Sequence, residues 1–343
     1  MLFHRMESRD IRINLATEDY LMNTVEIDEP ILLMYIQHPC LIVGKHQNIY
    51  EEIAVDQAMK DGVIITRRLS GGGTVFDDLG NISFSFIIRK GQVKFGDYPT
   101  ITQPIVDALK AMGVDNISVN GRNDIFIDGK KISGNAMYTK NQSMFSHGTL
   151  LFDVDLNRME KYLIVSKEKI KTTHIQSVES RVTNIKPYLN KSYQKLTIEG
   201  FRDELIRRIF KVDSIEEISS QEIILSQFDQ EQIQQSVSEV YSNDDWVYGH
   251  HQIFDIKRNA YIKNVGLIEV AFTVEKGKIG EISFSGDYFS QKNQQEVCEK
   301  LKGKRLIFNE LMSDLTDSEI DLCFSGLDKE SLILLLLGEL VND

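Results

Sequence analysis

Residues 67–81 read RRLSGGGTVFDDLGN, and the interpretation of the whole chain begins from this stretch. Three successive glycines let the backbone take positive φ and approach a ligand with no Cβ in the way. The run joins two apolar segments of strand type and matches neither GxGxxG nor a P-loop. Its free N–H groups form a candidate anion site, to which Arg67 and Arg68 add positive charge. The alternative is a glycine-rich hairpin with solvated arginines.

A second polar run, GRNDIFIDGKKISG, covers residues 121–134. The Asp-Gly pair between its two short apolar segments predicts a two-residue hairpin turn. Side chains alternate along a strand, so Lys130 and Lys131 point to opposite faces and only one of them can enter a site. The oxygens of Asn123 and Asp124 suit a Mg²⁺ ion that bridges phosphates. The alternative is an ordinary hairpin with solvated lysines.

A third run, SHGTLLF, covers residues 146–152 and places His147 at the start of an apolar strand. A histidine in this position is more often structural than catalytic. No serine or cysteine beside it in the sequence has the pattern of a nucleophile.

The first 190 residues favour a mixed α/β arrangement, because short apolar runs alternate with amphipathic segments. Strands are expected at 31–36, 41–43 and 63–65, and residues 82–88 alternate as a half-buried strand does. One helix is expected from Asn14 to Thr24, and another opens at Pro104 and ends at Gly113.

A domain boundary is expected near Asn243-Asp244-Asp245, which Trp246 and Gly249 follow. Beyond it the strand pattern restarts, with alternation from Ile268 to Val274, and leucine-rich helices close the chain. This pattern predicts a small α+β module. We expect one domain over residues 1–246 and a second over 250–343.

The composition of the 343 residues, 42% hydrophobic and 26% charged, is that of a globular protein. A net charge of −12 weighs against nucleic-acid binding. Cys40, Cys298 and Cys323 are scattered with no CxxC pair, which favours a reducing compartment and argues against structural zinc. No apolar run is long enough to span a membrane, so a cytoplasmic location is expected.

Taken together, the motifs RRxSGGGxVxxDLGN, GRND, K-[IV]-S-G and HGTLL occur in the order and at the intervals found in lipoate–protein ligases. The chain resembles this family over most of residues 10–190, with shorter matches at NLATE (14–18), GKHQN (44–48) and SVESRVTN (177–184). The terminal module resembles the accessory domain of the family's long form. The implied fold is α/β (α+β): a large mixed-sheet catalytic domain of the biotin/lipoyl-ligase type plus a small α+β accessory domain.

The resemblance implies an enzyme that activates lipoate with ATP and Mg²⁺ to lipoyl-AMP. It then transfers the lipoyl group to a lysine of apo lipoyl carriers, namely E2 lipoyl domains of 2-oxoacid dehydrogenases and the glycine cleavage H protein. The implied ATP residues are Arg68, Gly73, Thr74, Val75, Phe76, Asn81, Asn123, Asp124 and Lys131. The implied lipoate residues are Glu18, Ser70, Gly72, Lys131 and His147. Lys131 is the implied catalytic residue, and Asp124 is the implied Mg²⁺ ligand.

One position departs from the family pattern, because Asp77 stands where the family often has histidine. An octanoyl or lipoyl transferase of the same fold is a rival, but it needs a cysteine nucleophile, and none lies between Leu41 and Val297. A biotin ligase is a weaker rival, because its GRGRxGRxW loop is absent. A non-catalytic lipoate-binding protein remains an alternative.

Overall fold

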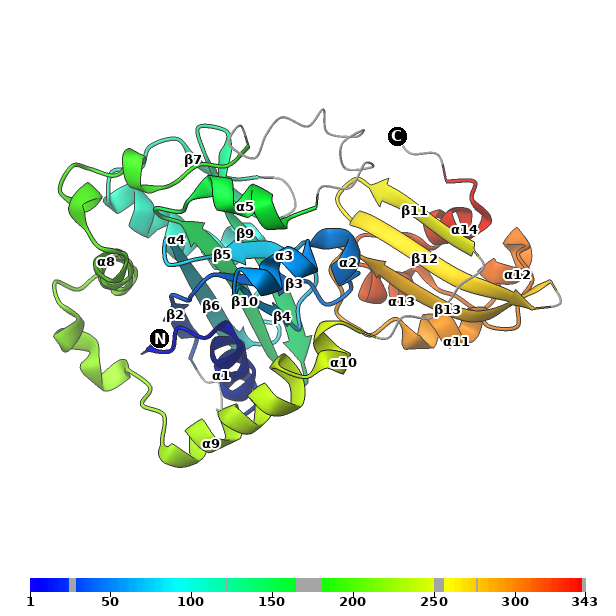
Figure 1. The fold of residues 1–343 in the computed structure, drawn as a ribbon, viewed down its shortest axis with the longest axis horizontal. Helices are drawn as coiled ribbons and strands as arrows, with labels where there is room; N and C mark the ends of the chain where they lie inside the picture. Colours follow the sequence, from blue (N-terminus) through cyan, green and yellow to red (C-terminus); the bar gives the residue numbers. More distant parts are fainter. Residues whose placement is uncertain (25–28, 121–122, 165–180, 250–255, 276, 341–343) are drawn as a thin grey trace.

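A seven-stranded mixed sheet forms the centre of residues 1–249 in the computed structural model (Figure 1). The structure describes residues 1–24, 29–120, 123–164, 181–249, 256–275 and 277–340. In spatial order the strands are β1 (Leu2–Arg5), β2 (Ile31–Tyr35), β6 (Asn81–Arg89), β10 (Ser143–Leu151), β9 (Lys130–Lys140), β8 (Asp124–Ile127) and β7 (Ile117–Asn120). The β1–β2 pair is parallel, and the other neighbours are antiparallel.

Helices cover both faces of this sheet (Figure 1). The helices α4 (Tyr98–Ala111) and α8 (Ile198–Phe210) share one core with it, and α1 (Ile11–Thr24) and α9 (Gln227–Ser236) share the other. Short helical turns join these elements: η1 (Lys186–Tyr188), η2 (Tyr193–Lys195), η3 (Ile215–Gln221) and η4 (Val237–Tyr241). Among the described residues, no helix has the length and apolar character needed to cross a bilayer.

A second sheet of three strands lies beside the first and carries the glycine-rich stretch. Its order is β4 (Ile64–Arg67), β3 (Cys40–Val43) and β5 (Val75–Asp77). The short helices α2 (Ile49–Glu52), α3 (Val55–Lys60) and α5 (Leu156–Tyr162) contribute to its core. The glycine-rich stretch therefore connects two strands, β4 and β5, as its sequence predicts.

Two predictions about these elements are wrong in detail. The helix expected at Pro104 begins at Tyr98, because Asp97 caps it and Pro99 occupies its first turn, so Pro104 lies inside the helix. The strand expected to be half-buried is β6, and its residues from Asn81 to Ile88 are all buried. It is a central strand of the sheet, and helices cover both of its faces, α4 and α8 on one side and α1 and α9 on the other.

A separate antiparallel sheet organises the C-terminal part, on the right in Figure 1. Its strands are β11 (Ile256–Ile262), β12 (Gly266–Glu275) and β13 (Lys278–Gly286). The helices α11 (Gln295–Leu301), α12 (Phe308–Met312), α13 (Asp317–Cys323) and α14 (Lys329–Leu337) share its core. The predicted alternation along β12 is confirmed, because Ile268, Val270 and Phe272 are buried in this core. We call residues 256–340 the terminal module.

The stretch expected as a boundary forms a short helix, α10 (Asp244–Val247), which Asn243 caps. This helix stays with the first part of the chain, because Trp246 Nε1 donates to Arg67 O at 3.0 Å. The exact expected limits, after 246 and at 250, stay predictions. Residues 250–255 lie outside the described residues, as do Gly121, Arg122 and residues 177–180 of the sequence motifs.

Candidate active site

A cavity lies between one face of the seven-stranded sheet and the loop that joins β4 to β5. It holds about 620 Å³ of empty space, part of it open to solvent. Part of its wall is a row of register partners on β2, β6 and β10, namely Tyr35, Ser83 and Thr149. The other lining residues are Leu15, Ile42, Arg68, Gly72, Gly73, Thr74, Val75, Asn123, Lys131, Gly134, Asn135, Ala136, His147 and Gly148.

The glycine loop, residues 70–74, packs tightly against the chain on two sides. Gly72 has a φ of +90°, and a Cβ on Gly44 would lie 1.9 Å from the Gly72 carbonyl oxygen. A Cβ on Gly71 would lie 2.2 Å from the carbonyl oxygen of Tyr288. The positive φ of Gly72 and the close approach at Gly71 explain why these two positions of the loop are glycine.

Arg68 lies beneath the glycine loop and holds its backbone. Its guanidinium donates to Gly71 O at 2.8 Å and to Gly73 O at 2.7 Å. It also donates to Ile42 O at 2.9 Å and, through Nε, to Ser70 Oγ at 3.1 Å. Burial lowers the pKa of Arg68 to about 10, so it remains charged at neutral pH. Most of its donors are thus bonded within the protein.

Arg67 is also buried, and its position contradicts the interpretation of this side chain as a phosphate contact. It donates to the carbonyl oxygens of Gly44 at 2.8 Å and Gln47 at 2.7 Å. On its other side it donates to Trp246 O and Val247 O. Arg67 therefore fastens α10 to the segment that follows β3.

Lys131 enters the cavity from the start of β9. Its Nζ lies 2.9 Å from Asp124 Oδ1 on the neighbouring strand β8. A Cβ on Gly134 would come within 3.1 Å of the same Nζ, so the glycine leaves room for the lysine side chain. Lys130 is exposed and does not line the cavity. The predicted separation of the two lysines is confirmed.

An asparagine pair holds the strands that carry Lys131 and Asp124. Asn135 Nδ2 donates to Asn123 O at 2.9 Å, and Asn123 Nδ2 donates to Asn135 O in return. Asn135 leaves no room at Gly148 on β10, where a Cβ would lie 2.1 Å from Asn135 Oδ1. These bonds fix the register of β8 and β9 at the cavity.

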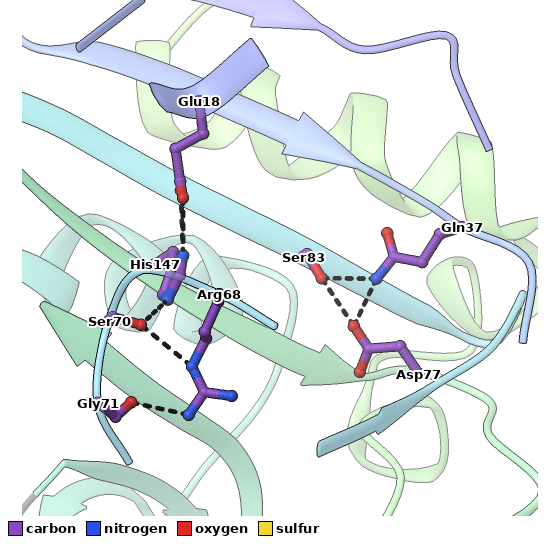
Figure 2. A network of polar contacts seen from close by, with 8 residues as sticks. All are labelled: Glu18, Gln37, Arg68, Ser70, Gly71, Asp77, Ser83 and His147. Carbon is purple, nitrogen blue, oxygen red and sulfur yellow. Dashed lines mark hydrogen bonds and ion pairs between the residues drawn. The ribbon is translucent and has the colours of Figure 1, made fainter. Parts of the chain in front are cut away.

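A chain of polar side chains connects α1 to the glycine loop (Figure 2). His147 Nδ1 lies 3.0 and 3.1 Å from the two Glu18 carboxylate oxygens. His147 Nε2 lies 2.7 Å from Ser70 Oγ, which also accepts from Arg68 Nε. The residues around His147 in the sequence gave no sign of a nucleophile, and Ser70 reaches the histidine from a segment distant in the sequence.

Asp77 lies in a second polar cluster, to the right in Figure 2. Its carboxylate accepts from Ser83 Oγ at 2.9 Å, from Asn81 Nδ2 at 2.9 Å and from Gln37 Nε2. Burial, more than any other cause, raises the pKa of Asp77 to about 6. Ser83 lines the cavity, so Asp77 is one hydrogen bond away from it.

The terminal module contacts the glycine loop directly. Gly72 N donates to Tyr288 O at 3.3 Å, and Gly286 N donates to His46 O at 2.7 Å. The His46 ring stacks on Tyr288 with centroids 4.5 Å apart, and its Nε2 lies 2.8 Å from Ser290 Oγ. We call this contact the seam.

Both parts of the chain match models of known protein families. Residues 10–210 match the lipoyl protein ligase A/B catalytic domain, and residues 252–336 match the bacterial lipoate protein ligase C-terminus. Lipoate-protein ligase LplJ of Bacillus subtilis is 37% identical over 94% of this chain and 96% of its own length. Lipoate–protein ligase 1 of Staphylococcus aureus is 35% identical over 95% and 97%.

The chain belongs to the lipoate–protein ligase family. Its activity class is therefore that of a ligase that joins lipoate to protein. The resemblance inferred from the sequence motifs is confirmed by these matches.

Solved structures of lipoate ligases share the fold. LipL1 of P. falciparum, in complex with lipoate, has a TM-score of 0.72 at 24% identity and covers 98% of this chain and 99% of its own. A lipoate-protein ligase A bound with ATP has a TM-score of 0.60 at 24% identity over 72% and 98%. The bi-partite ligase of Thermoplasma acidophilum, described with its E2 lipoyl domain, has a TM-score of 0.62 at 24% identity over 74% and 98%. The expected fold class is confirmed.

The residues that the resemblance implied lie at different distances from the ligase's cavity. Those that line it are Arg68, Gly72, Gly73, Thr74, Val75, Asn123, Lys131 and His147. Glu18 and Ser70 lie behind His147, and Asp124 lies behind Lys131. Phe76 stacks on Tyr162 in a hydrophobic core, and Asn81 is buried against Asp77. Phe76 and Asn81 neither line the cavity nor lie behind a named lining lysine or histidine.

Several lining residues of the ligase were not foreseen. Tyr35, Ser83 and Thr149 form the row across three strands, and Ala136 lies on β9 beside His147. The signal for Ser83 was present, since serines alternate with apolar residues along β6. Without the loop and helix that lie over this face of the sheet, the alternation indicates solvent as readily as a cavity.

Proposed function

We propose that this ligase activates lipoate with ATP to lipoyl-AMP and passes the lipoyl group to a lysine of an apo lipoyl carrier. The observation that carries the proposal is the position of Lys131, whose ammonium enters a cavity that the glycine loop borders. A carboxylate acylates amines poorly at neutral pH, so it first needs a good leaving group. A cation and backbone donors around one cavity suit that step.

In the first step a lipoate oxygen attacks the α-phosphorus of ATP, and pyrophosphate leaves. Negative charge grows on the phosphoryl oxygens, and Lys131 stabilises it as a compact point charge. The support for an ATP site is the bordering glycine loop and the related ligase described as bound with ATP. Arg68 contributes by holding the loop, because most of its donors are engaged there.

In the second step the amine of the carrier lysine attacks the carbonyl carbon of lipoyl-AMP, and AMP leaves. The carbonyl oxygen becomes negative in this step, and Lys131 is placed to stabilise it. Asp124 Oδ1, 2.9 Å from Lys131 Nζ, orients the lysine side chain. No protein nucleophile takes part.

The proposal includes a Mg²⁺ ion whose ligands come mainly from the phosphates of the nucleotide. Among the described residues, no cluster of three or more potential ligands could hold a metal ion. Mg²⁺ at nucleotide sites usually takes one or two carboxylates plus phosphate oxygens, and Asp124 offers one such carboxylate. When bound there, the ion would neutralise phosphate charge.

The proposed partners are E2 lipoyl domains and the glycine cleavage H protein, in the cytoplasm. The archaeal ligase described with its E2 lipoyl domain supports a partner of this kind. The three cysteines are free thiols, which suits a reducing compartment. All three are buried and none lines the cavity, so the geometry favours a ligase over a transferase that forms a cysteine thioester.

The test compares Lys131→Ala with the matched control Lys130→Ala. The proteins are incubated with lipoate, ATP, Mg²⁺ and an apo-carrier, and carrier modification is followed by intact mass. Loss of the Lys131 charge is expected to lower the rate about 100- to 1000-fold, the usual effect of removing a stabilising donor. Lys130 is exposed, so its variant should retain the parent rate. Equal losses in both variants would show that Lys131 has no special role.

A further inference from the structure

Gln47 is a buried residue that bonds to the turn after β3 and to the end of the glycine loop. Its Oε1 accepts from Gly44 N at 2.9 Å and from Thr74 Oγ1 at 2.8 Å. Thr74 lines the cavity, whereas Gln47 lies behind it. A side chain outside the cavity therefore orients the hydroxyl of a residue in its wall.

The direction of each bond follows from the groups involved. A backbone N–H can only donate, so the Gln47 atom next to Gly44 N is the amide oxygen and not the nitrogen. The same oxygen lies next to Thr74 Oγ1, so the threonine hydroxyl gives its proton to Gln47. Gln47 Nε2 is buried without a hydrogen-bond partner in the described part of the chain, so these two donors alone set the orientation of the amide.

The Thr74 hydroxyl consequently offers the cavity lone pairs and no proton. Gln47 is its only hydrogen-bond partner among the described residues, and Thr74 is only half-buried. The other residues of the glycine loop that line the cavity are Gly72 and Gly73, which have no side chain. Thr74 is thus the position at which the loop presents a side-chain acceptor to a ligand.

A free acceptor in the cavity favours a ligand group that carries an N–H or O–H donor. The phosphates of ATP and the carboxylate of lipoate are ionised and only accept, and the dithiolane ring has no such donor. The nucleoside carries donors in its adenine amino group and its ribose hydroxyls. The carrier lysine carries donors too, but it enters only after the adenylate has formed.

We propose that Thr74 is a specificity-determining residue that accepts a hydrogen bond from the nucleoside of ATP. Gln47 is the positioning residue that keeps the Thr74 hydroxyl in its accepting orientation. The donor is the adenine amino group or a ribose hydroxyl. The inference rests on the proposed function, since it takes the ligand of the cavity to be ATP.

The experiment compares kcat/KM for ATP with that for three analogues, in the full-length protein with lipoate and Mg²⁺, by release of pyrophosphate. The triphosphate of purine riboside lacks the amino group, and 2′-deoxy-ATP and 3′-deoxy-ATP each lack one hydroxyl. The variants are Thr74→Val, Gln47→Leu and Gln47→Glu. Thr66→Val is the matched control, because the buried Thr66 hydroxyl donates to Tyr241 O and does not line the cavity.

In the parent, one analogue should be used about tenfold less efficiently than ATP, as expected for one lost hydrogen bond, and that analogue identifies the donor. Thr74→Val should bring the ratio of the two nucleotides to within about twofold. Gln47→Leu should lower the discrimination at least about threefold, because the freed hydroxyl also turns its proton towards the nucleoside. Gln47→Glu keeps an accepting oxygen, so it should retain the discrimination, as should Thr66→Val.

Equal use of ATP and all three analogues by the parent would overturn the inference. Undiminished discrimination in Thr74→Val would do the same, even if every rate fell, because that result marks a structural role. Undiminished discrimination in Gln47→Leu would overturn the positioning role of Gln47. A parent that releases no pyrophosphate from ATP and lipoate would instead refute the proposed function.

Discussion

Asp77 is the residue where charge and burial conflict most directly in this ligase. Its direct partners among the described residues are the neutral side chains of Gln37, Asn81 and Ser83. The amide oxygens of Gln37 and Asn81 have no hydrogen-bond partner in the part of the chain that the structure describes, because both side chains present their N–H groups to the carboxylate. The cluster is arranged for an anion, although burial opposes the charge.

Replacement of Asp77 by Asn is expected to stabilise the protein at neutral pH. The folded-state pKa is raised from 3.8 to about 6, so the folded state keeps a proton that the unfolded state has released. Stability therefore falls as pH rises from about 4 to about 6 and stays lower above that window. One pKa unit is ~1.4 kcal/mol, which makes the loss about 3 kcal/mol at pH 7. Gln37 can rotate its amide and offer Oε1 to the new side chain.

The measurement is thermal unfolding of parent and variant at about pH 4 and about pH 7.5. The two proteins should unfold at similar temperatures at the lower pH, and the variant should be the more stable one at the higher pH. A variant that is less stable at both values would show that the ionised carboxylate is compensated in the folded state.

For single residues, the sequence predicted the charge and the chemical role of a side chain more reliably than its contacts. Lys131 was separated from Lys130 by strand alternation, a local rule that needs no tertiary structure. Arg67 and Arg68 were expected at phosphate, because clustered positive charge beside glycines suggests an anion. Their guanidinium groups turned to backbone carbonyls from segments distant in sequence, and no local pattern records those partners.

Among the elements, β6 is a strand that its alternating sequence predicted correctly, although the burial of its serine face was not predicted. Alternating serines predicted a strand, and the strand is there. The serine face was expected in solvent, but it lies on the side of the sheet that carries the cavity and α1, so Ser83 lines the cavity and Ser85 is fully buried. The helices that cover the two faces come from segments tens of residues away or more in the sequence, so burial of both faces could not be inferred from the strand itself.

The seam depends on a histidine that is held neutral. Burial above all, together with the nearby charges of Lys45 and Arg67, lowers the pKa of His46 from 6.5 to about 3. The ring stacks on Tyr288 and bonds to Ser290, so protonation would place a positive charge in the contact.

The contribution of His46 to stability should be complete above pH 6.5 and be lost as pH falls towards 3. The unfolded state takes up a proton in that window and the folded state does not. The expected loss at pH 5 is about 2 kcal/mol. His46→Gln should make the unfolding temperature less dependent on pH, at a cost in stability near pH 7.5.

The matched control is His38→Gln, because His38 is exposed. Unfolding temperatures of the three proteins are compared across the same pH range. A steep acid dependence that persists in His46→Gln would mean that another group destabilises the fold in acid.

In the whole molecule, the core of the terminal module is largely separate from the cores of the first part of the chain. Phe289 is the exception, because it belongs to the terminal module by sequence but packs in the core of the seven-stranded sheet. Its ring lies 5.8 Å from that of Tyr98 on α4. Hydrophobic periodicity does not show that one aromatic residue of the module packs in another core, so the sequence did not predict the position of Phe289.

Truncation after Tyr248 is expected to impair the activation of lipoate more than transfer. The cut keeps Val247, which Arg67 binds, but it removes Tyr288 and therefore the acceptor for Gly72 N. The glycine loop then loses a fixed contact beside the proposed nucleotide site, and formation of lipoyl-AMP should fall at least about tenfold. Transfer from lipoyl-AMP supplied ready-made should continue, since Lys131 remains.

Carrier modification is measured from each starting material, with circular dichroism to confirm that the fragment is folded. Phe289→Ala in the full chain is the control for the loss of core packing alone. Undiminished activation by the folded fragment would show that the module has no part in that step.

The contact of Gly71 with the terminal module has an evolutionary consequence. A Cβ at this position would lie 2.2 Å from the Tyr288 carbonyl oxygen, so the module excludes a side chain there. Gly73, by contrast, has open space around it. In homologues that lack the module, selection at the first glycine should relax, and alanine or serine should accumulate. Position 71 would then record, in a sequence alone, whether an ancestor carried the second domain.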